Sequence, residues 1–346
     1  MRKIILLMIL VTCAVVPANA TDFTAPSAPD IAQEYMPEDT DSFAEGLWYV
    51  IRTAISNLQP SLAEAAGVCL SLFAVILLVS LMQSFSNSTQ KVTQLVGTLG
   101  IGVLLITPTN SLIKLGTETI SQLSDYGKLL LPVLTGALAA QGGTTSSAAL
   151  YTGTVVFDAV LSSVISKLIV PMLYIFLCLC LASNAMGEGL IKKLRDFVKW
   201  TMTWELKIVL YAFTGYISIT SVISGTADAA TIKAAKLAIS GAVPVVGSIL
   251  SDASETILVS AGVLKSAVGV YGLLAILAVW IGPFLQIGTQ YLLLKITAAV
   301  SSVIATKESS ALMDDFCGAM GMLLAMTGTV CLLLLISTVC FMKGVS

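Results

Sequence analysis

Three charged side chains lie inside long apolar stretches of the sequence. A charge in such surroundings is costly unless it faces water, an ion or an opposite charge. These side chains are therefore candidates for the lining of a passage or cavity; the simpler alternative is that a lysine pairs with an acid on another helix. The three residues and the stretches around them are Asp158 (148–170), Lys265 (257–281) and Lys295 (284–305).

A segment that contains both proline and glycine, residues 241–256, reads GAVPVVGSILSDASET. Pro244 lacks a backbone donor and Gly247 permits a non-helical turn, which favours a broken helix here. Asp252 and Glu255 follow this break. They suit two roles, capping of the next helix at a membrane edge or a vestibule that contacts a partner.

The densest basic cluster lies in residues 187–207 and includes Lys192, Lys193, Arg195 and Lys199. Apolar residues and Trp204 alternate with these cations at helical spacing, a pattern typical of interfacial helices. Two roles fit the cluster, which are anchoring to anionic lipid and docking of a cytoplasmic partner.

The residue inventory argues against an enzyme. The chain has no histidine, and its seven cysteines include no C-x-x-C pair. Histidine-based acid–base catalysis and histidine-coordinated metals are thereby excluded. We expect no catalytic, cofactor-binding or metal-binding residues. A net charge of −2 offers no basic footprint for nucleic acid.

Composition places the chain in a membrane. Of 346 residues, 56% are hydrophobic and only 11% charged, with a mean hydropathy of +0.94. Soluble domains are about 25% charged. The apolar runs are continuous, without the alternation that a transmembrane barrel requires. We predict an all-α, polytopic transmembrane helix bundle.

Residues 1–20 have the three parts of a secretory signal peptide. Arg2 and Lys3 precede an apolar run over 4–16, and Ala18-Asn19-Ala20 forms a small-x-small cleavage site. We predict cleavage after Ala20. Lipid attachment at Cys13 and retention of the segment as an extra span are the alternatives.

Residues 21–60 form an acidic head that would begin on the extracytoplasmic side. Its first half contains three prolines and has no periodicity. From Phe43 to Leu58 the apolar residues recur at helical spacing. This predicts an amphipathic helix that lies on the membrane surface or on a partner.

About 20 apolar residues are needed to cross a bilayer. The sequence predicts seven to ten spans, some of them interrupted or re-entrant. Five crossings before the basic cluster would place it in the cytoplasm, as the positive-inside rule requires. The candidate spans are 62–82, 92–107, 124–140, 148–170, 171–186, 206–225, 234–251, 257–281, 284–305 and 318–342.

A weak internal repeat suggests duplication. Pro132-Val133 precedes Pro171 by 39 residues, and Pro244-Val245 precedes Pro283 by the same number. We therefore predict two units, 115–226 and 227–346, after two spans in 61–114; chance alignment in so apolar a chain is the alternative. Duplicated bundles with broken helices are typical of transporters.

The stretch from Lys236 to Gly247, the Ser251–Thr256 block and the Lys265–Gly272 segment together resemble the stage III sporulation protein AE family of endospore-forming bacteria. The P-V-V-G-x-x-x-S-D block, residues 244–252, is the most specific part. Signal peptide, acidic head, multiple spans and chain length agree with that family. The resemblance covers nearly the whole chain.

The resemblance implies a role in the assembly of stage III A proteins, which meets a forespore protein across the intermembrane space and resembles specialised secretion systems. The chain would be its large multi-pass component in the mother-cell membrane around the forespore, a non-enzymatic subunit that forms or supports a passage. The implied partners are other stage III A membrane proteins, membrane lipid and further copies of the chain. A self-contained transporter and an assembly scaffold are the other hypotheses.

Overall fold

The computed structural model describes residues 25–37, 42–85, 90–140, 144–186, 189–223 and 267–343. All the regular structure in these ranges is helical, as the sequence predicted. The helices are α2 (Asp30–Gln33), α3 (Phe43–Ser56), α4 (Gln59–Phe85), α5 (Gln90–Ala140), α6 (Thr144–Val164), η1 (Ile165–Ile169), α7 (Val170–Met186), α8 (Gly189–Ile223), α11 (Ala267–Ser301) and α12 (Lys307–Lys343).

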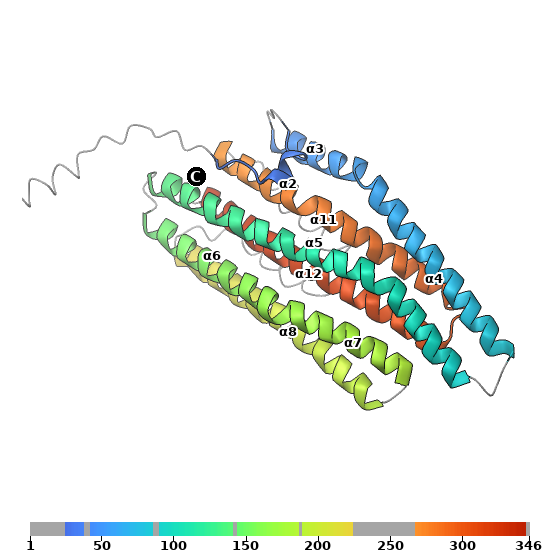
Figure 1. Ribbon diagram of the computed structural model, residues 1–346. Coiled ribbons are helices and arrows are strands. Elements are labelled where there is room, and N and C mark those ends of the chain that lie inside the picture. The colour runs from blue at the N-terminus through green and yellow to red at the C-terminus, as the bar shows by residue number, and fades with distance from the viewer. Residues whose placement is uncertain are drawn as a thin grey trace, which may run out of the picture.

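The long helices lie side by side as an elongated bundle (Figure 1). One end of the bundle gathers the end of α4, the start of α5, the end of α7, the start of α8 and the α11–α12 connection. We call this the basal end. The opposite end, where α5 ends and α6 and α11 begin, is the distal end.

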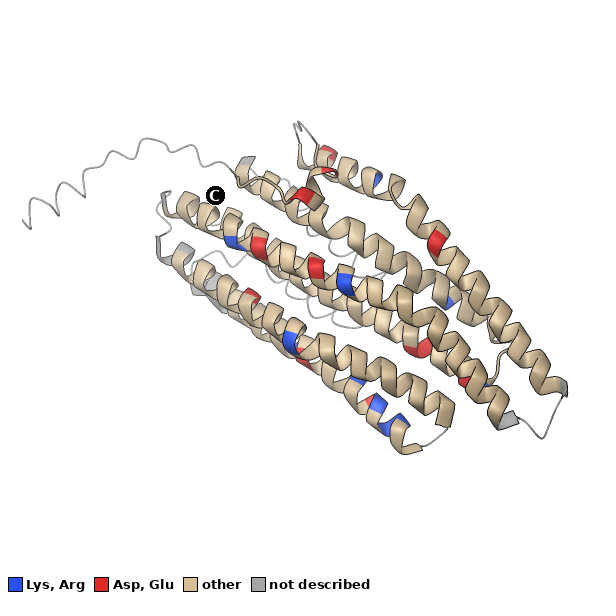
Figure 2. Ribbon diagram, viewed as in Figure 1, with Lys and Arg blue, Asp and Glu red and all other residues tan. Residues whose placement is uncertain are grey.

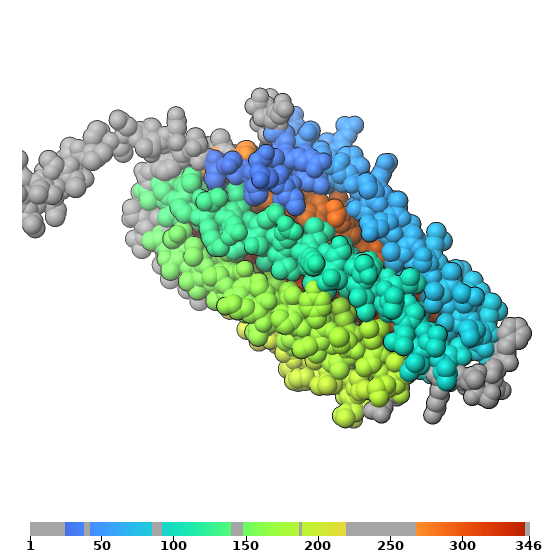
Figure 3. All heavy atoms as spheres, viewed as in Figure 1, coloured from blue at the N-terminus to red at the C-terminus, as the bar shows by residue number. Residues whose placement is uncertain are grey.

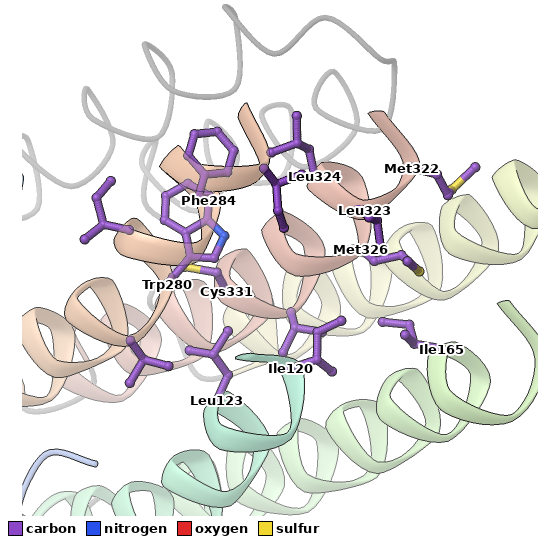
Figure 4. Packing of buried hydrophobic residues seen from close by; sticks show 14 of the residues in the cluster. Ile120, Leu123, Ile165, Trp280, Phe284, Met322, Leu323, Leu324, Met326 and Cys331 are labelled. Atoms are coloured by element: carbon purple, nitrogen blue, oxygen red, sulfur yellow. The ribbon is translucent and has the colours of Figure 1, made fainter. Parts of the chain in front are cut away.

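The hairpin of α11 and α12 forms the centre of the bundle. The most apolar window of α11 is 83% buried and that of α12 is 78% buried, against 28–39% for the other three apolar spans. Figure 4 shows the packing, in which Ile120 and Leu123 of α5, Ile165 of η1 and Trp280 of α11 meet side chains of α12. Burial of apolar surface is the main favourable term in folding, so this hairpin organises the rest.

Among the described residues, five helical stretches are long and apolar enough to cross a membrane. Predicted spans 92–107 and 124–140 lie in a single helix, the 51-residue α5. Its length is about 75 Å, against about 30 Å for a hydrocarbon core. The polar residues between the two predicted spans continue the helix because they lie on its exposed face, as Lys114 and Glu118 do.

Predicted spans 148–170 and 171–186 also run without interruption. The helix passes through a π-helical turn, η1, just before Pro171. Pro171 lacks a backbone N–H, and the wider turn accommodates this loss without ending the helix. Likewise, Pro283 lies inside α11. Three continuous traversals, α4, α5 and α6–α7, therefore precede α8 where the sequence suggested five.

The predicted amphipathic helix from Phe43 is α3, and Ser42 caps it by accepting a hydrogen bond from the Glu45 backbone N–H at 3.3 Å. Its apolar face was expected on the membrane or on a partner. It instead packs against α11 of the same chain, with Val50 fully buried. Predicted signal peptide 1–20 lies outside the described residues, and the two-unit duplication stays a prediction.

Candidate functional site

Arg195 of α8 lies at the centre of a buried polar network near the basal end. Its Nη1 donates to Asp315 Oδ2 of α12 at 2.6 Å, and its Nε and Nη2 donate to Asp196 Oδ1 at 3.0 and 2.8 Å. The side chains of Arg195 and Asp315 are only 10% and 11% exposed. Burial lowers the pKa of Arg195. The two carboxylates together raise this pKa by more than burial lowers it, so it lies above the ordinary value.

Two amides extend this network to the neighbouring helices. Asn184 of α7 donates to Asp315 Oδ2 at 3.3 Å and to the Cys180 carbonyl at 2.8 Å. Gln94 of α5 donates to the Asn184 carbonyl at 3.1 Å. The network thereby joins α5, α7, α8 and α12. A paired, hydrogen-bonded charge is the form in which a protein interior tolerates ions.

Lys295 of α11 pairs with Asp314 of α12, with 2.9 Å between Nζ and Oδ1. The two side chains are 54% and 56% exposed. This is an interhelical pair of a lysine with an acid, the simpler alternative that the sequence offered for Lys295. Lys295 therefore lies on the surface of the described bundle.

Lys192, Lys193 and Lys199 near the start of α8 are exposed, and Figure 2 shows the basic residues gathered on this part of the helix. Beside them runs a stripe of exposed aromatic side chains, in which Phe197 and Trp200 have ring centroids 6.1 Å apart. Trp204 continues the stripe 6.0 Å further along. The predicted basic cluster is thus divided between a buried Arg195 and an exposed face of lysines and aromatics.

Asp158 of α6 is 4% exposed and faces α5. Its Oδ2 accepts a hydrogen bond from Ser124 at 2.6 Å, whereas Oδ1 is buried without a hydrogen-bond partner. Asp158 lies 28 residues before the basal end of α7, and Lys295 lies six residues before that of α11. At 1.5 Å per residue the two are separated by about 30 Å along the bundle, so they do not form one site.

The remaining candidates, Lys265, Pro244, Gly247, Asp252 and Glu255, lie outside the described residues. Within the described ranges, no group of three His, Cys, Asp or Glu side chains is placed to hold a metal ion. Most of the described cysteines are buried in the apolar core. The polar groups described above join neighbouring helices and can hold them in position.

Sequence reasoning missed Asp314, Asp315 and Asn184 as partners of the two cations. One signal was present, because Met313-Asp314-Asp315-Phe316 resembles Leu194-Arg195-Asp196-Phe197. In the structure the two segments contact each other through the Arg195–Asp315 pair.

Comparison with known proteins identifies the chain. The model of the family described as "Stage III sporulation protein AE" matches residues 31–344. The Stage III sporulation protein AE of Bacillus subtilis (strain 168) is 25% identical over 236 residues, which cover 67% of this chain and 58% of that relative. The match therefore spans less than two thirds of the relative's length. No solved structure matches the chain. With its family model matched from residue 31 to residue 344, this multi-pass, all-helical chain belongs to the stage III sporulation protein AE family.

Proposed function

We propose that the protein is a non-enzymatic, multi-pass membrane subunit of a channel complex that links mother cell and forespore during sporulation. In this proposal it supports a transmembrane passage together with other chains. Family membership supplies the link to sporulation. The packing of the bundle favours a passage built between chains over one contained within a single chain.

The filled centre of the bundle carries this proposal. The α11–α12 hairpin occupies the axis with large apolar side chains such as Trp280, Phe316 and Leu323, all of which are buried. Of the described charged residues, only Asp158, Arg195 and Asp315 are buried. These three charges lie in two separate places, and the axis between them is packed with apolar side chains.

Partners would meet the chain on its surfaces. The acidic head lies against the distal half, where the Ala28 N–H donates to the Tyr271 hydroxyl at 3.3 Å. The lysines and aromatics of α8 lie at the basal end, and they suit anionic lipid or a cytoplasmic partner. Further copies of the chain and other stage III A proteins are the partners that we propose.

A self-contained transporter is the second candidate function. It would use Asp158, Lys265 and Lys295 to bind a substrate or coupling ion between two repeats. The roughly 30 Å between Asp158 and Lys295 and the surface position of Lys295 disfavour this reading. A pure scaffold, which would support assembly without bordering a passage, is the third.

Reconstitution into vesicles separates these functions. The chain alone and the chain with its stage III A partners are compared for the release of a trapped dye and for gradient-driven solute uptake. We expect dye release to require several chains, either as a homo-oligomer or with the partners. Solute uptake coupled to a gradient by monomeric protein would overturn the proposal in favour of a transporter. If no dye is released under any condition, the assembly scaffold is the function that remains.

Loss of the gene provides the matching test in cells. A deletion strain of the source bacterium should form far fewer spores, and the wild-type gene should restore them. The Arg195→Ala variant removes one partner of a buried ion pair and should destabilise the fold. Its spore count therefore shows what misfolding of the chain alone does to sporulation. Normal spore counts in the deletion strain would contradict a role in sporulation.

A further inference from the structure

Three helices carry an uncharged run of similar length that starts at the basal end. The runs are residues 65–85 of α4, 92–113 of α5 and 168–186, which span the end of η1 and all of α7. Each is about 20 residues long, which corresponds to about 30 Å of helix and to the thickness of a hydrocarbon core. An exposed charged residue ends each run on its distal side, namely Glu64, Lys114 and Lys167.

Large apolar side chains point outward along these runs. Val103 is 71% exposed and Leu70 is 72% exposed, and Leu78, Leu99, Leu168 and Ile175 are also exposed. The corresponding surface lies on the face of the bundle built by α4, α5 and α7 in Figure 3. In Figure 2 these runs carry no coloured charges. Water would not stabilise so many exposed apolar side chains in one band.

The outward face of α5 changes character in the middle of the helix. Up to Ile106 its exposed residues are mostly large and apolar. Beyond that point the exposed residues include Ser111, Lys114, Glu118, Ser121, Asp125 and Lys128. The inward face stays apolar in the same segment, with Ile120 and Leu123 buried. The distal half of α5 therefore has the pattern of a helix in a water-soluble protein.

The other side of the basal half mixes charges with exposed apolar side chains such as Leu194 of α8 and Leu292 of α11. Lys192, Lys193 and Lys199 of α8 are exposed there, and so is the Lys295–Asp314 pair between α11 and α12. Charges exposed to hydrocarbon are costly. Charges thus interrupt the apolar surface on that side, whereas the side formed by α4, α5 and α7 carries an uninterrupted apolar band.

We propose that bilayer hydrocarbon covers the α4–α5–α7 surface of the basal half, and that the outward face of the distal half of α5 stands in water. The lysines at the start of α8 place the basal end in the cytoplasm. The distal half, with the acidic head packed on α11, then projects on the extracytoplasmic side. This inference rests on the membrane location of the proposed function and not on the passage, so the labelling result and the dye-release result can fail independently.

A matched pair of positions on α5 tests the boundary. Val103 and Ser121 lie 18 residues apart, which is five helical turns, so both point outward in the same direction about 27 Å apart. Val103→Cys and Ser121→Cys are made separately in a Cys178→Ala background, because Cys178 is the exposed native cysteine of the described residues. Reaction with a membrane-impermeant maleimide is measured in native membranes opened to both sides. Thermal unfolding of both variants provides the folding control.

We expect the cysteine at 121 to react on the order of tenfold faster or more than the cysteine at 103, because thiols inside hydrocarbon are shielded from water-soluble reagents. A spin label at 103 should collide with oxygen more than with a water-soluble nickel chelate, and a label at 121 should show the reverse. Equal reactivity at the two positions would overturn the boundary. Low collision with both quenchers at 103 would show that protein, and not lipid, covers the band.

Discussion

Asp314 and Asp315 are neighbours in the sequence, yet they tie α12 to different helices. Asp314 pairs with Lys295 of α11 at a half-exposed site, and Asp315 pairs with Arg195 of α8 inside the bundle. Successive residues of a helix point about 100° apart, which allows one acidic pair to fix two contacts at once. The same geometry predicts that the two pairs contribute unequally to stability.

Removal of the buried pair's acid should be strongly destabilising. Asp315→Ala leaves the Arg195 guanidinium buried and less than fully neutralised, which costs about 3–5 kcal/mol. The double variant Arg195→Met/Asp315→Leu removes both charges and should recover most of that loss. The measurement is thermal or denaturant unfolding in mild detergent. A double variant no more stable than Asp315→Ala would refute the assignment of the loss to an unpaired charge.

Asp125→Ala is the matched control for that experiment. Asp125 pairs with Lys128 at 2.8 Å, close to the 2.6 Å of the Arg195–Asp315 pair, but its side chain and that of Lys128 are 67% and 61% exposed. Water screens such a pair, so its loss should cost no more than about 1 kcal/mol. A larger loss than that of Asp315→Ala would contradict the burial argument.

Lys295→Met should be tolerated. The pair with Asp314 is half-exposed, and its removal is expected to cost about 1 kcal/mol or less. Spore counts and dye release should stay close to wild type. A sharp fall in either, in protein that unfolds at the wild-type temperature, would give Lys295 a role in passage beyond its ion pair.

Asp158→Asn distinguishes a structural carboxylate from a transport site. The amide keeps an oxygen that can accept the Ser124 hydrogen bond. If Asp158 only joins α5 to α6, sporulation should persist in Asp158→Asn, and Ser124→Ala should cost about 1–3 kcal/mol of stability. Loss of sporulation with normal stability in Asp158→Asn would support the transporter.

Two glycines in helix interiors test the close packing of α6 on α8. The Tyr216 ring lies where a Cβ of residue 153 would be, and its hydroxyl donates to the Ala149 carbonyl at 2.6 Å. Nothing lies within 4 Å of a Cβ at residue 215. Gly215→Ala should gain up to about 1 kcal/mol of helix propensity. Gly153→Ala should lose about 1–2 kcal/mol, because the ring must move. Equal unfolding temperatures for the two variants would contradict this packing.

Orientation can be read from two exposed lysines at opposite levels. Lys192→Cys near the basal end should react with an impermeant maleimide only in inverted vesicles, and Lys128→Cys should react only in protoplasts, each in the Cys178→Ala background. The positive-inside rule predicts this sidedness. The reverse pattern would place the acidic head in the cytoplasm.

The helical class followed from the sequence because hydropathy is a local property. The amphipathic helix at Phe43 was also predictable, since its spacing and its Ser42 cap are read from neighbouring residues. The spans were predicted too short because a 20-residue window cannot distinguish a loop from a helix with a polar exposed face. Residues 108–123 of α5 are of the second kind.

The candidate site also has a part that the sequence predicts and a part that depends on the tertiary structure. The sequence established that few charges exist and that several lie in apolar surroundings, because those are counts and neighbours along the chain. Only the tertiary structure decided which of them meet. Arg195 and Asp315 are 120 residues apart, and their contact depends on the packing of α8 against α12. An ion pair is set by distances in space, whereas hydropathy and helix periodicity are set by order along the chain.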